Sequence, residues 1–291
     1  MEHDINLLSL HRKVLEIRIF EESLLKMYDK GLLRGTVHTS LGQEAVAVGL
    51  LSNAIKGDSV FSSHRCHGHY IANGGDLKSL FLEIMGNKDG ICGGIGGSQH
   101  INNNDFFSNG VQGSYMPISV GLALGKKINN NNNIAISFIG DGTLGEGVVY
   151  EALNMASLYE VPLLIALENN GWAQTTSIEN NFSGNIAERC RGFNILPHEI
   201  NGSDVEALYS DFRSIIEKVR KEKKPVMAII NTYRLGPHSK GDDTREKKYI
   251  DEIKKNDPLL ISKKKCGEFQ EIEESVKKEI SNILNEIGVK I

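Results

Sequence analysis

The sequence has no long hydrophobic run, no secretory leader pattern and no regular spacing of cysteines. No apolar stretch reaches the roughly 18–20 residues that a membrane-spanning helix needs, so we expect no membrane partner. The first residues, MEHDINLLSLHRKVLEI, do not show a basic region, an apolar core and a cleavage site in that order. The four cysteines are scattered, as is usual in a reducing compartment: Cys66, Cys92, Cys190 and Cys266. Together these absences predict a cytoplasmic protein.

The sequence also has little net charge. Its 33 basic and 37 acidic residues give −4 at pH 7, which is too small a field to predict binding to nucleic acid or to an anionic membrane. Charged runs such as KVRKEKK mix both signs or fall late in the chain, and we interpret them as solvated helix faces. With 40% hydrophobic residues, the composition is that of an ordinary globular protein, and the length allows one large α/β domain or two small ones.

The first third of the chain combines helical periodicity with one long polar stretch. Apolar residues at helical spacing predict a helix over residues 4–30, with Asp4 as its N-terminal cap and Gly31 at its end. A second helix is expected over residues 43–55 and a short strand at DSVFSS (58–63). Residues 86–114 are rich in Gly and Asn. They are too polar for a core and too long for a plain connection, which predicts a functional loop.

Helices and continuous apolar strands then alternate along the chain. Helices are predicted at 115–127, 146–159 and 204–220, and buried strands at NIAISFI, VPLLIALE and PVMAIINTYR. This alternation predicts the α/β class, with a parallel sheet covered by helices on both faces. We expect one domain over residues 1–291 with a charged helical tail from about residue 246, and a surface loop at Asn129–Asn133.

An acidic residue stands between two glycines directly after one of these strands, in GDGTLGEG (140–147). If the two strands of this βαβ unit are neighbours, Asp141 meets Asn169 and Asn170 at the carboxyl edge of the sheet, where open α/β folds bind ligands. A carboxylate, an amide oxygen and a nearby backbone carbonyl suit Mg²⁺, which often shares its ligands with phosphates. The glycines allow close approach of a diphosphate, and a helix beginning near Gly145 favours anions. The alternative is a simple turn with Asp141 as a cap.

The combination GDG and NN, with 26 residues between them, resembles the thiamine diphosphate signature. The wider stretch resembles the α subunit of the E1 components of 2-oxo acid dehydrogenases, which include pyruvate, branched-chain and acetoin-type enzymes. The resemblance covers roughly residues 8–262. It rests on five further blocks in order: HTSLGQEAVAVGL (38–50), HRCHGHYIANGG (64–75), GGIGGSQH (93–100), NGVQGSYMPISVGLALG (109–125) and TYRLGPHSKGDD (232–243).

The resemblance implies a site, residue by residue. The Mg²⁺ ligands are the side chains of Asp141 and Asn170 and the backbone carbonyl of Trp172. His38 and His238 are the candidate catalytic residues. The cofactor-binding residues are His64, Arg65, Gly110, Gln112, Gly140, Asp141, Gly142, Thr143, Asn170, Trp172, Arg234 and His238. Two blocks depart from the usual pattern. GVQGSYMP leaves the aminopyrimidine contacts less defined, and Pro237 precedes His238 where many members have Gly or His.

The resemblance also implies an activity and its partners. Such an enzyme decarboxylates a 2-oxo acid, or cleaves acetoin, with thiamine diphosphate and Mg²⁺. It is an oxidoreductase that passes the acyl group to a lipoyl group on an E2 acyltransferase. A separate β subunit supplies the other half of the site in an α2β2 heterotetramer, because 291 residues leave no room for a second cofactor-binding domain. The alternatives are the N-terminal half of a split transketolase and a non-catalytic E1-like subunit.

Three features have simpler or different interpretations. His64, Cys66, His67 and His69 are candidates for a zinc cluster, although their spacing fits a closed four-ligand site poorly. His67 and His100 either line the pocket or hold loops. GGIGGS resembles a nucleotide-binding loop, but it neither follows a clear strand nor opens a clear helix.

Overall fold

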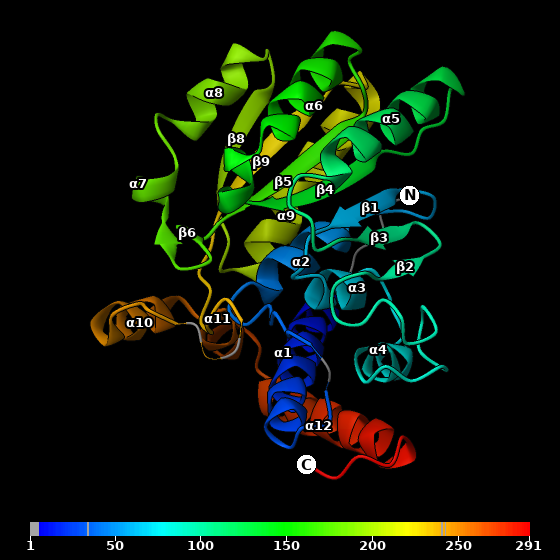
Figure 1. The fold of residues 1–291 in the computed structure, drawn as a ribbon, viewed down its shortest axis with the longest axis vertical. Helices are drawn as coiled ribbons and strands as arrows, with labels where there is room; N and C mark the ends of the chain where they lie inside the picture. Colours follow the sequence, from blue (N-terminus) through cyan, green and yellow to red (C-terminus); the bar gives the residue numbers. More distant parts are fainter. Residues whose placement is uncertain (1–5, 34, 240, 242) are drawn as a thin grey trace.

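The computed structural model describes residues 6–33, 35–239, 241 and 243–291. A seven-stranded sheet runs through its centre (Figure 1), and only its first edge pair is antiparallel. In spatial order the strands are β2 (Asn102–Asn103), β3 (Phe106–Ser108), β1 (Ser59–Ser62), β4 (Ala135–Gly140), β5 (Leu163–Asn169), β9 (Val226–Asn231) and β8 (Leu196–Asn201). A separate hairpin pairs β6 (Trp172–Ala173) with β7 (Thr176–Ser177). The predicted parallel α/β sheet is therefore confirmed.

Helices cover both faces of this sheet, as predicted. The α-helices are α1 (Leu7–Asp29), α2 (Glu44–Leu51), α3 (His67–Ala72), α4 (Leu77–Ile84), α5 (Tyr115–Ile128), α6 (Gly147–Leu158), α7 (Ile178–Asn181), α8 (Ile186–Gly192), α9 (Val205–Glu222), α10 (Lys247–Ile253), α11 (Pro258–Lys265) and α12 (Phe269–Glu286). Two short 3-10 turns are η1 (Asp141–Gly145) and η2 (Lys254–Asn256). None of these helices combines the length and apolar character that crossing a bilayer requires.

The pleat of the strands divides the core into two layers. In β4, Ile136 and Phe138 pack in a cluster with residues of α1, α2 and α9, while Ala135 and Ile139 pack with residues of α5 and α6. Successive strand side chains point to opposite faces, so a strand that is apolar throughout needs a helix layer on each side. In Figure 1, α5, α6 and α8 lie on one side of the sheet and α1, α2 and α12 on the other.

The first helix begins later than the sequence predicts. Its N-terminal cap is Asn6, whose Oδ1 accepts the Leu8 N–H at 3.0 Å, whereas Asp4 lies outside the described residues. The predicted end is confirmed, because Gly31 follows the C-cap with φ +69°, a left-handed conformation that glycine adopts without strain.

The charged tail is helical, as predicted, and it packs onto the rest of the chain. One face of α12 buries Phe269, Val276, Ile280 and Leu284 in the same core cluster as α1. The 86–114 stretch is mostly loop but also contains β2 and β3. Sequence reasoning missed β8 because Pro197 and polar residues break its apolar pattern. An edge strand tolerates both, since only one of its sides pairs.

Candidate active site

Four neighbouring parallel strands end beside one another, and each is followed by residues that the sequence singled out. His64 and Arg65 follow β1, Asp141 follows β4, and Asn170 follows β5. Arg234 follows β9, which is the other neighbour of β5. The predicted neighbourhood of the GDG and NN segments is confirmed by the register, in which Gly140 pairs with Glu168. Parallel strands present their carboxyl ends at one edge, so residues far apart in sequence meet there.

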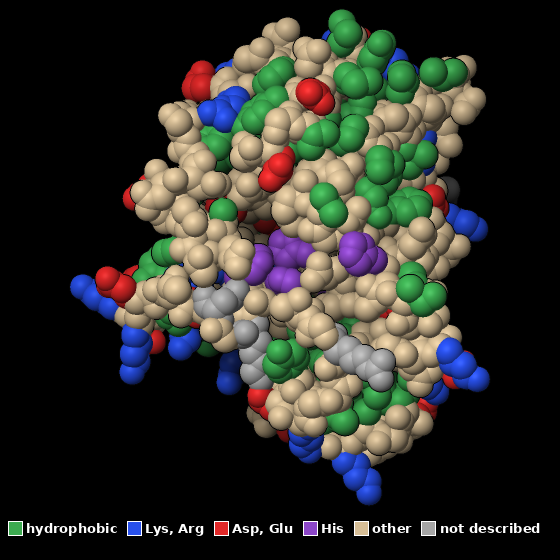
Figure 2. All heavy atoms as spheres, viewed as in Figure 1, with side chains coloured by type: hydrophobic (Ala, Val, Ile, Leu, Met, Phe, Trp, Pro, Cys, Tyr) green, Lys and Arg blue, Asp and Glu red, His purple; other side chains and the backbone are tan. Residues whose placement is uncertain are grey.

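These residues surround a cavity of about 430 Å³. In the space-filling view, histidine side chains gather in a hollow near the middle of the molecule (Figure 2). The lining includes every predicted site residue: His38, His64, Arg65, Gly110, Gln112, Gly140, Asp141, Gly142, Thr143, Asn170, Trp172, Arg234 and His238. It also includes residues that the sequence reasoning missed: Gln43, Ser63, Gln99, Glu168, Ala173, Gln174, Thr176 and Asn181. Some of these residues, such as Ser63 and Ala173, are chain neighbours of a predicted site residue, and this adjacency could have indicated them.

Asp141 has one carboxylate oxygen held in place and one without a partner. The side chain is buried, and this burial raises its pKa from 3.8 to about 6, although the backbone N–H groups of Gly142 and Gly171 and the charge of Arg234 oppose the shift. Within the described part of the chain, Asp141 Oδ2 is buried and has no hydrogen-bond partner. Such an oxygen is costly unless a cation or a donor meets it. The site therefore fits a bound cation.

The neighbouring oxygens belong to a tight turn after β5. Asn170 Oδ1 accepts the N–H of Trp172 at 3.1 Å, which fixes the backbone of Trp172 beside it. A carboxylate, an amide oxygen and a backbone carbonyl form a hard donor set that suits Mg²⁺ better than a thiophilic metal.

The helix expected to begin near Gly145 begins at Gly147 and is preceded by a separate short turn. The short η1 turn covers Asp141–Gly145, and α6 begins only at Gly147, because Glu146 between them is extended (φ −90°, ψ 125°). Gly142 is a point of close approach, since a Cβ there would lie 2.8 Å from the Ala173 Cβ. A Cβ at Gly140 would meet no described atom within 4 Å.

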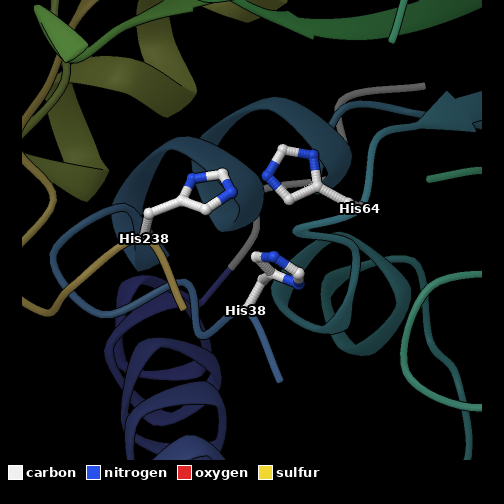
Figure 3. Close-up of side chains that lie close together, drawn as sticks. All are labelled: His38, His64 and His238. Atoms are coloured by element: carbon white, nitrogen blue, oxygen red, sulfur yellow. The ribbon is translucent and has the colours of Figure 1, made fainter. Parts of the chain in front are cut away.

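Three imidazoles from three segments face one another at the cavity (Figure 3). The ring centroids of His38, His64 and His238 lie 4.7–5.1 Å apart. Burial lowers the pKa of His64 well below 6.5, and the charges of Arg65, of the other two histidines and of Arg234 add to this. His64 is therefore neutral at pH 7.

A polar chain connects three of the predicted residues. The Gln112 amide nitrogen lies 2.6 Å from His64 Nδ1, and its oxygen accepts the Thr143 hydroxyl at 2.9 Å. An amide that donates to Nδ1 leaves the proton of neutral His64 on Nε2. That Nε2 is buried and has no hydrogen-bond partner among the described residues.

The histidine trio suits an anion better than a metal. Its ligand nitrogens are separated by up to 4.8 Å, whereas zinc bonds of about 2.1 Å bring tetrahedral ligands to about 3.4 Å. The charges of Arg65 and Arg234 act on His64, so they oppose a cation bound to the three histidines. Arg65 also donates to the carbonyls of Thr39 and His238, so it ties together the segments that carry two of the histidines.

The alternative of a zinc cluster at His64, Cys66, His67 and His69, which their spacing already disfavoured, is excluded because these side chains contact different partners. His67 lies 3.1 Å from Glu21 Oε2, and His69 Nδ1 lies 2.8 Å from the Ser62 hydroxyl. The second nitrogen of His69 lies 3.6 Å from Glu168. Neither His67 nor the exposed His100 lines the cavity. His67 holds the loop through its contact with Ser98.

The glycine-rich loop is not an open phosphate loop, because a residue of this chain already uses its N–H groups. The carboxylate of Glu83, in α4, accepts four of them: from Cys92 (2.7 Å), Gly94 (2.8 Å), Gly96 (2.8 Å) and Gly97 (3.1 Å). Sequence reasoning missed Glu83, which is fully buried.

Arg245 stabilises the segment that carries Arg234 and His238. Arg245 donates to both carboxylate oxygens of Asp243 and to the carbonyls of Arg234 and Gly236. The pKa of Asp243 is lowered, chiefly by its hydrogen bond from Arg245. Arg245 thus fixes the backbone of the loop after β9 at the edge of the cavity.

Known proteins resemble this chain along nearly its whole length. The family described as Dehydrogenase E1 component matches residues 12–287. A pyruvate dehydrogenase E1 component subunit alpha from Rickettsia felis is 35% identical over 280 residues, covering 91% of this chain and 86% of the relative. One from Zymomonas mobilis is 38% identical, covering 89% and 75%. The alpha subunit of an acetoin:2,6-dichlorophenolindophenol oxidoreductase from Bacillus subtilis is 32% identical, covering 95% and 87%.

Proposed function

The chain belongs to the dehydrogenase E1 component family, and on this premise we propose that it is the α subunit of a 2-oxo acid or acetoin dehydrogenase. The observation that carries the proposal is the cavity, because residues from four strand ends and three loops meet there in the combination that the family resemblance implied. The relatives reported above include no transketolase, and we do not retain that alternative.

Family membership implies dependence on thiamine diphosphate, and we propose Mg²⁺ as its companion. The orphan oxygen of Asp141, the amide oxygen of Asn170 and the carbonyl of Trp172 would hold the metal. When bound, thiamine diphosphate supplies the nucleophilic carbon and accepts the electron pair released when the carbon–carbon bond breaks. Gly140, Gly142 and Thr143 would hold the diphosphate with their backbone, supported by the charge of Arg65 and Arg234.

The histidines would handle protons and charge during the reaction. His38 and His238 are 4.8 Å apart between ring centroids, which suits two groups that act on one small substrate. His64 is neutral, so it would act as a hydrogen-bond donor through Nε2 and not as a cation. Gly110 and Gln112 would contact the cofactor's pyrimidine end.

We propose that a β subunit completes the site in an α2β2 heterotetramer in the cytoplasm. The relatives carry the name alpha subunit, which supports a partner of another kind. A lipoyl group on an E2 acyltransferase is the proposed acyl acceptor. The reported relatives include pyruvate and acetoin enzymes, so both substrate types belong in the test.

The test begins with the tagged chain purified from its own cells and examined by native mass spectrometry. We expect two copies of this chain with two partner chains, carrying thiamine diphosphate and Mg²⁺. The assembly is then assayed with pyruvate, a branched-chain 2-oxo acid and acetoin, using an artificial electron acceptor and then a lipoyl domain. Asp141→Ala is the matched variant, which we expect to lose the metal and the cofactor. A wild-type assembly that binds no cofactor would support the non-catalytic subunit instead.

A further inference from the structure

A fully buried carboxylate lies next to the segment that carries His38. Glu21, in α1, is 0% exposed. Its Oε1 accepts the backbone N–H of Ser40 at 2.9 Å and the Ser40 hydroxyl at 2.8 Å, and its Oε2 lies 3.1 Å from Nδ1 of His67. A buried carboxylate is tolerated only where donors satisfy it, and here three do.

Two sets of contacts, here called arms, lead from Glu21 towards His38. The first arm, from Glu21 to Ser40, fixes the backbone that follows His38. Ser40 is two residues after His38, and Glu21 takes both of its donors. Gly68 in α3 packs closely against Ser40, since a Cβ at position 68 would lie 2.7 Å from Ser40 Oγ. The segment is therefore enclosed between α1 and α3, and a shift of Glu21 would move it.

The second arm reaches the ring of His38. The other nitrogen of His67 lies 3.0 Å from the hydroxyl and 3.1 Å from the carbonyl of Ser98. The next residue is Gln99, whose amide nitrogen lies 3.4 Å from Nδ1 of His38. The two arms thus meet at His38, one through its backbone and one through its side chain.

From these contacts we infer that Glu21 and His67 are positioning residues for His38. The inference rests on the function proposed above, in which His38 touches the substrate. An amide that donates to Nδ1 places the proton of neutral His38 on Nε2, so the Gln99 arm selects the tautomer as well as the orientation. Neither Glu21 nor His67 lines the cavity, so they act on the reaction only through His38.

Simple packing does not account for this pair. Apolar residues of similar volume usually fill an interior at lower cost than a buried acid and imidazole. Polar groups that are fully satisfied specify one arrangement of the elements they join. Here the elements joined are α1, α3, the His38 segment and the start of the loop after Ser98.

The experiment compares two substitutions in the assembled enzyme. His67→Asn retains a donor near Glu21 but is too short to reach Ser98, whereas His67→Gln reaches Ser98 from the position of Nε2. We expect His67→Asn to lower kcat by about 10- to 100-fold, because displacing a reacting group by about 1 Å costs on that order. Cofactor affinity should remain within about twofold, since no lining residue is changed. His67→Gln should recover part of kcat.

The matched control is a second histidine–carboxylate pair, in which α1 supplies the buried histidine and α9 supplies the partly exposed Glu206. His11 is 1% exposed and lies 2.9 Å from Glu206, and neither residue lines the cavity. His11→Gln should lower the melting temperature about as much as the His67 variants while leaving kcat unchanged. If His67→Asn does not fold, Ser98→Ala tests the same arm by removing one hydroxyl.

A second readout does not depend on the enzyme's activity. Diethylpyrocarbonate modifies neutral imidazoles, and mass spectrometry measures its rate at His38 in the full chain without cofactor. We expect this rate to change several-fold in His67→Asn and to stay constant in His11→Gln. Unchanged His38 reactivity in a folded His67→Asn protein would overturn the positioning role. If the wild-type assembly is inactive but His67→Asn still alters the reactivity of His38, the positioning role stands and the proposed function is wrong.

Discussion

The indole N–H of Trp172 donates a hydrogen bond to the phenolic oxygen of Tyr249 at 3.1 Å, and their rings meet edge to face at 5.8 Å. Tyr249 belongs to α10, in the charged tail, while Trp172 lines the cavity. The tail is thereby attached to the segment proposed to ligate Mg²⁺. Trp172 is also the single tryptophan of the sequence, so tryptophan fluorescence reports on this part of the cavity wall.

We predict that thiamine diphosphate with Mg²⁺ changes the fluorescence of Trp172 in a saturable way. Tyr249→Phe removes one hydrogen bond, worth about 0.5–1.5 kcal/mol, and should weaken the apparent cofactor affinity by up to about tenfold. A fluorescence titration measures both effects. Tyr209→Phe, on α9 and away from the cavity, is the control. Identical affinities for the wild type and Tyr249→Phe would show that the tail does not support the site.

Asp141→Asn should stabilise the ligand-free chain and abolish its response to Mg²⁺. Burial raises the pKa of Asp141 from 3.8 to about 6, so the folded state holds the proton more tightly than the unfolded state. Stability therefore falls as pH rises from about 4 to 6 and stays lower above that range. Asparagine removes this penalty, and we expect a gain of about 1–3 kcal/mol at pH 7.5 and little at pH 4.

Thermal unfolding at both pH values, with and without Mg²⁺ and thiamine diphosphate, measures these effects. The wild type should gain stability from the ligands at pH 7.5, whereas the variant should not. The idea fails if Asp141→Asn is less stable than the wild type at pH 7.5, or if the ligands still stabilise it.

The two glycines of the GDG segment should respond differently to alanine. Gly142→Ala places a methyl group 2.8 Å from the Ala173 Cβ, so overpacking should cost about 1–3 kcal/mol of stability. Gly140→Ala meets nothing within 4 Å and should leave the ligand-free stability unchanged. Its methyl group lies at the cavity wall, however, and should weaken cofactor binding. Adding Ala173→Gly to Gly142→Ala should restore part of the lost stability. Equal melting temperatures for the two single variants would contradict this difference.

Arg245→Lys should loosen the segment that carries Arg234 and His238. A lysine offers one nitrogen in place of the planar fork that contacts Asp243 and two carbonyls. We expect faster limited proteolysis within residues 234–245 and weaker cofactor binding. The lowered pKa of Asp243 means that this contact persists at neutral pH and is lost only as pH falls below the ordinary range of an aspartate. Arg213→Lys, in an exposed pair with Glu217, is the control and should change neither property.

The sequence predicted the site through the ends of its strands. Apolar runs located β4, β5 and β9, and the parallel arrangement of β4 and β5 brought Asp141 and Asn170 to one edge, whereas Arg234 after β9 came from the family resemblance. This step needs only chain order and the handedness of βαβ units. The loop residues His38 and Gln112 came instead from the family resemblance, because no periodicity places a loop in space.

The sequence could not identify the buried acids that organise the loops. Glu21 occurs on a helix among other charged residues, and nothing in its local pattern distinguishes it from a solvated one. Glu83 lies between Leu82 and Ile84, and the sequence does not show what it contacts. Only the fold shows that both are 0% exposed and surrounded by donors. The position of β8 was missed for a related reason, since an edge strand is specified by its neighbour β9 more than by its own residues.

Glu83→Gln tests whether a buried carboxylate holds the glycine-rich loop. Each oxygen of Glu83 accepts two backbone N–H groups, and a glutamine would replace one oxygen with a competing donor. Two partly buried N–H groups would then lose their acceptor, at up to about 1–3 kcal/mol each. We expect hydrogen exchange to accelerate across residues 92–97, with a loss of stability of about 2–5 kcal/mol. Because Gln99 follows this loop and contacts His38, kcat should fall as well.

Ile95→Ser is the control for this prediction, since Ile95 is 91% exposed at the loop tip and its backbone is unchanged. Normal exchange protection of the loop in Glu83→Gln would mean that the glycine backbone holds its shape without the carboxylate.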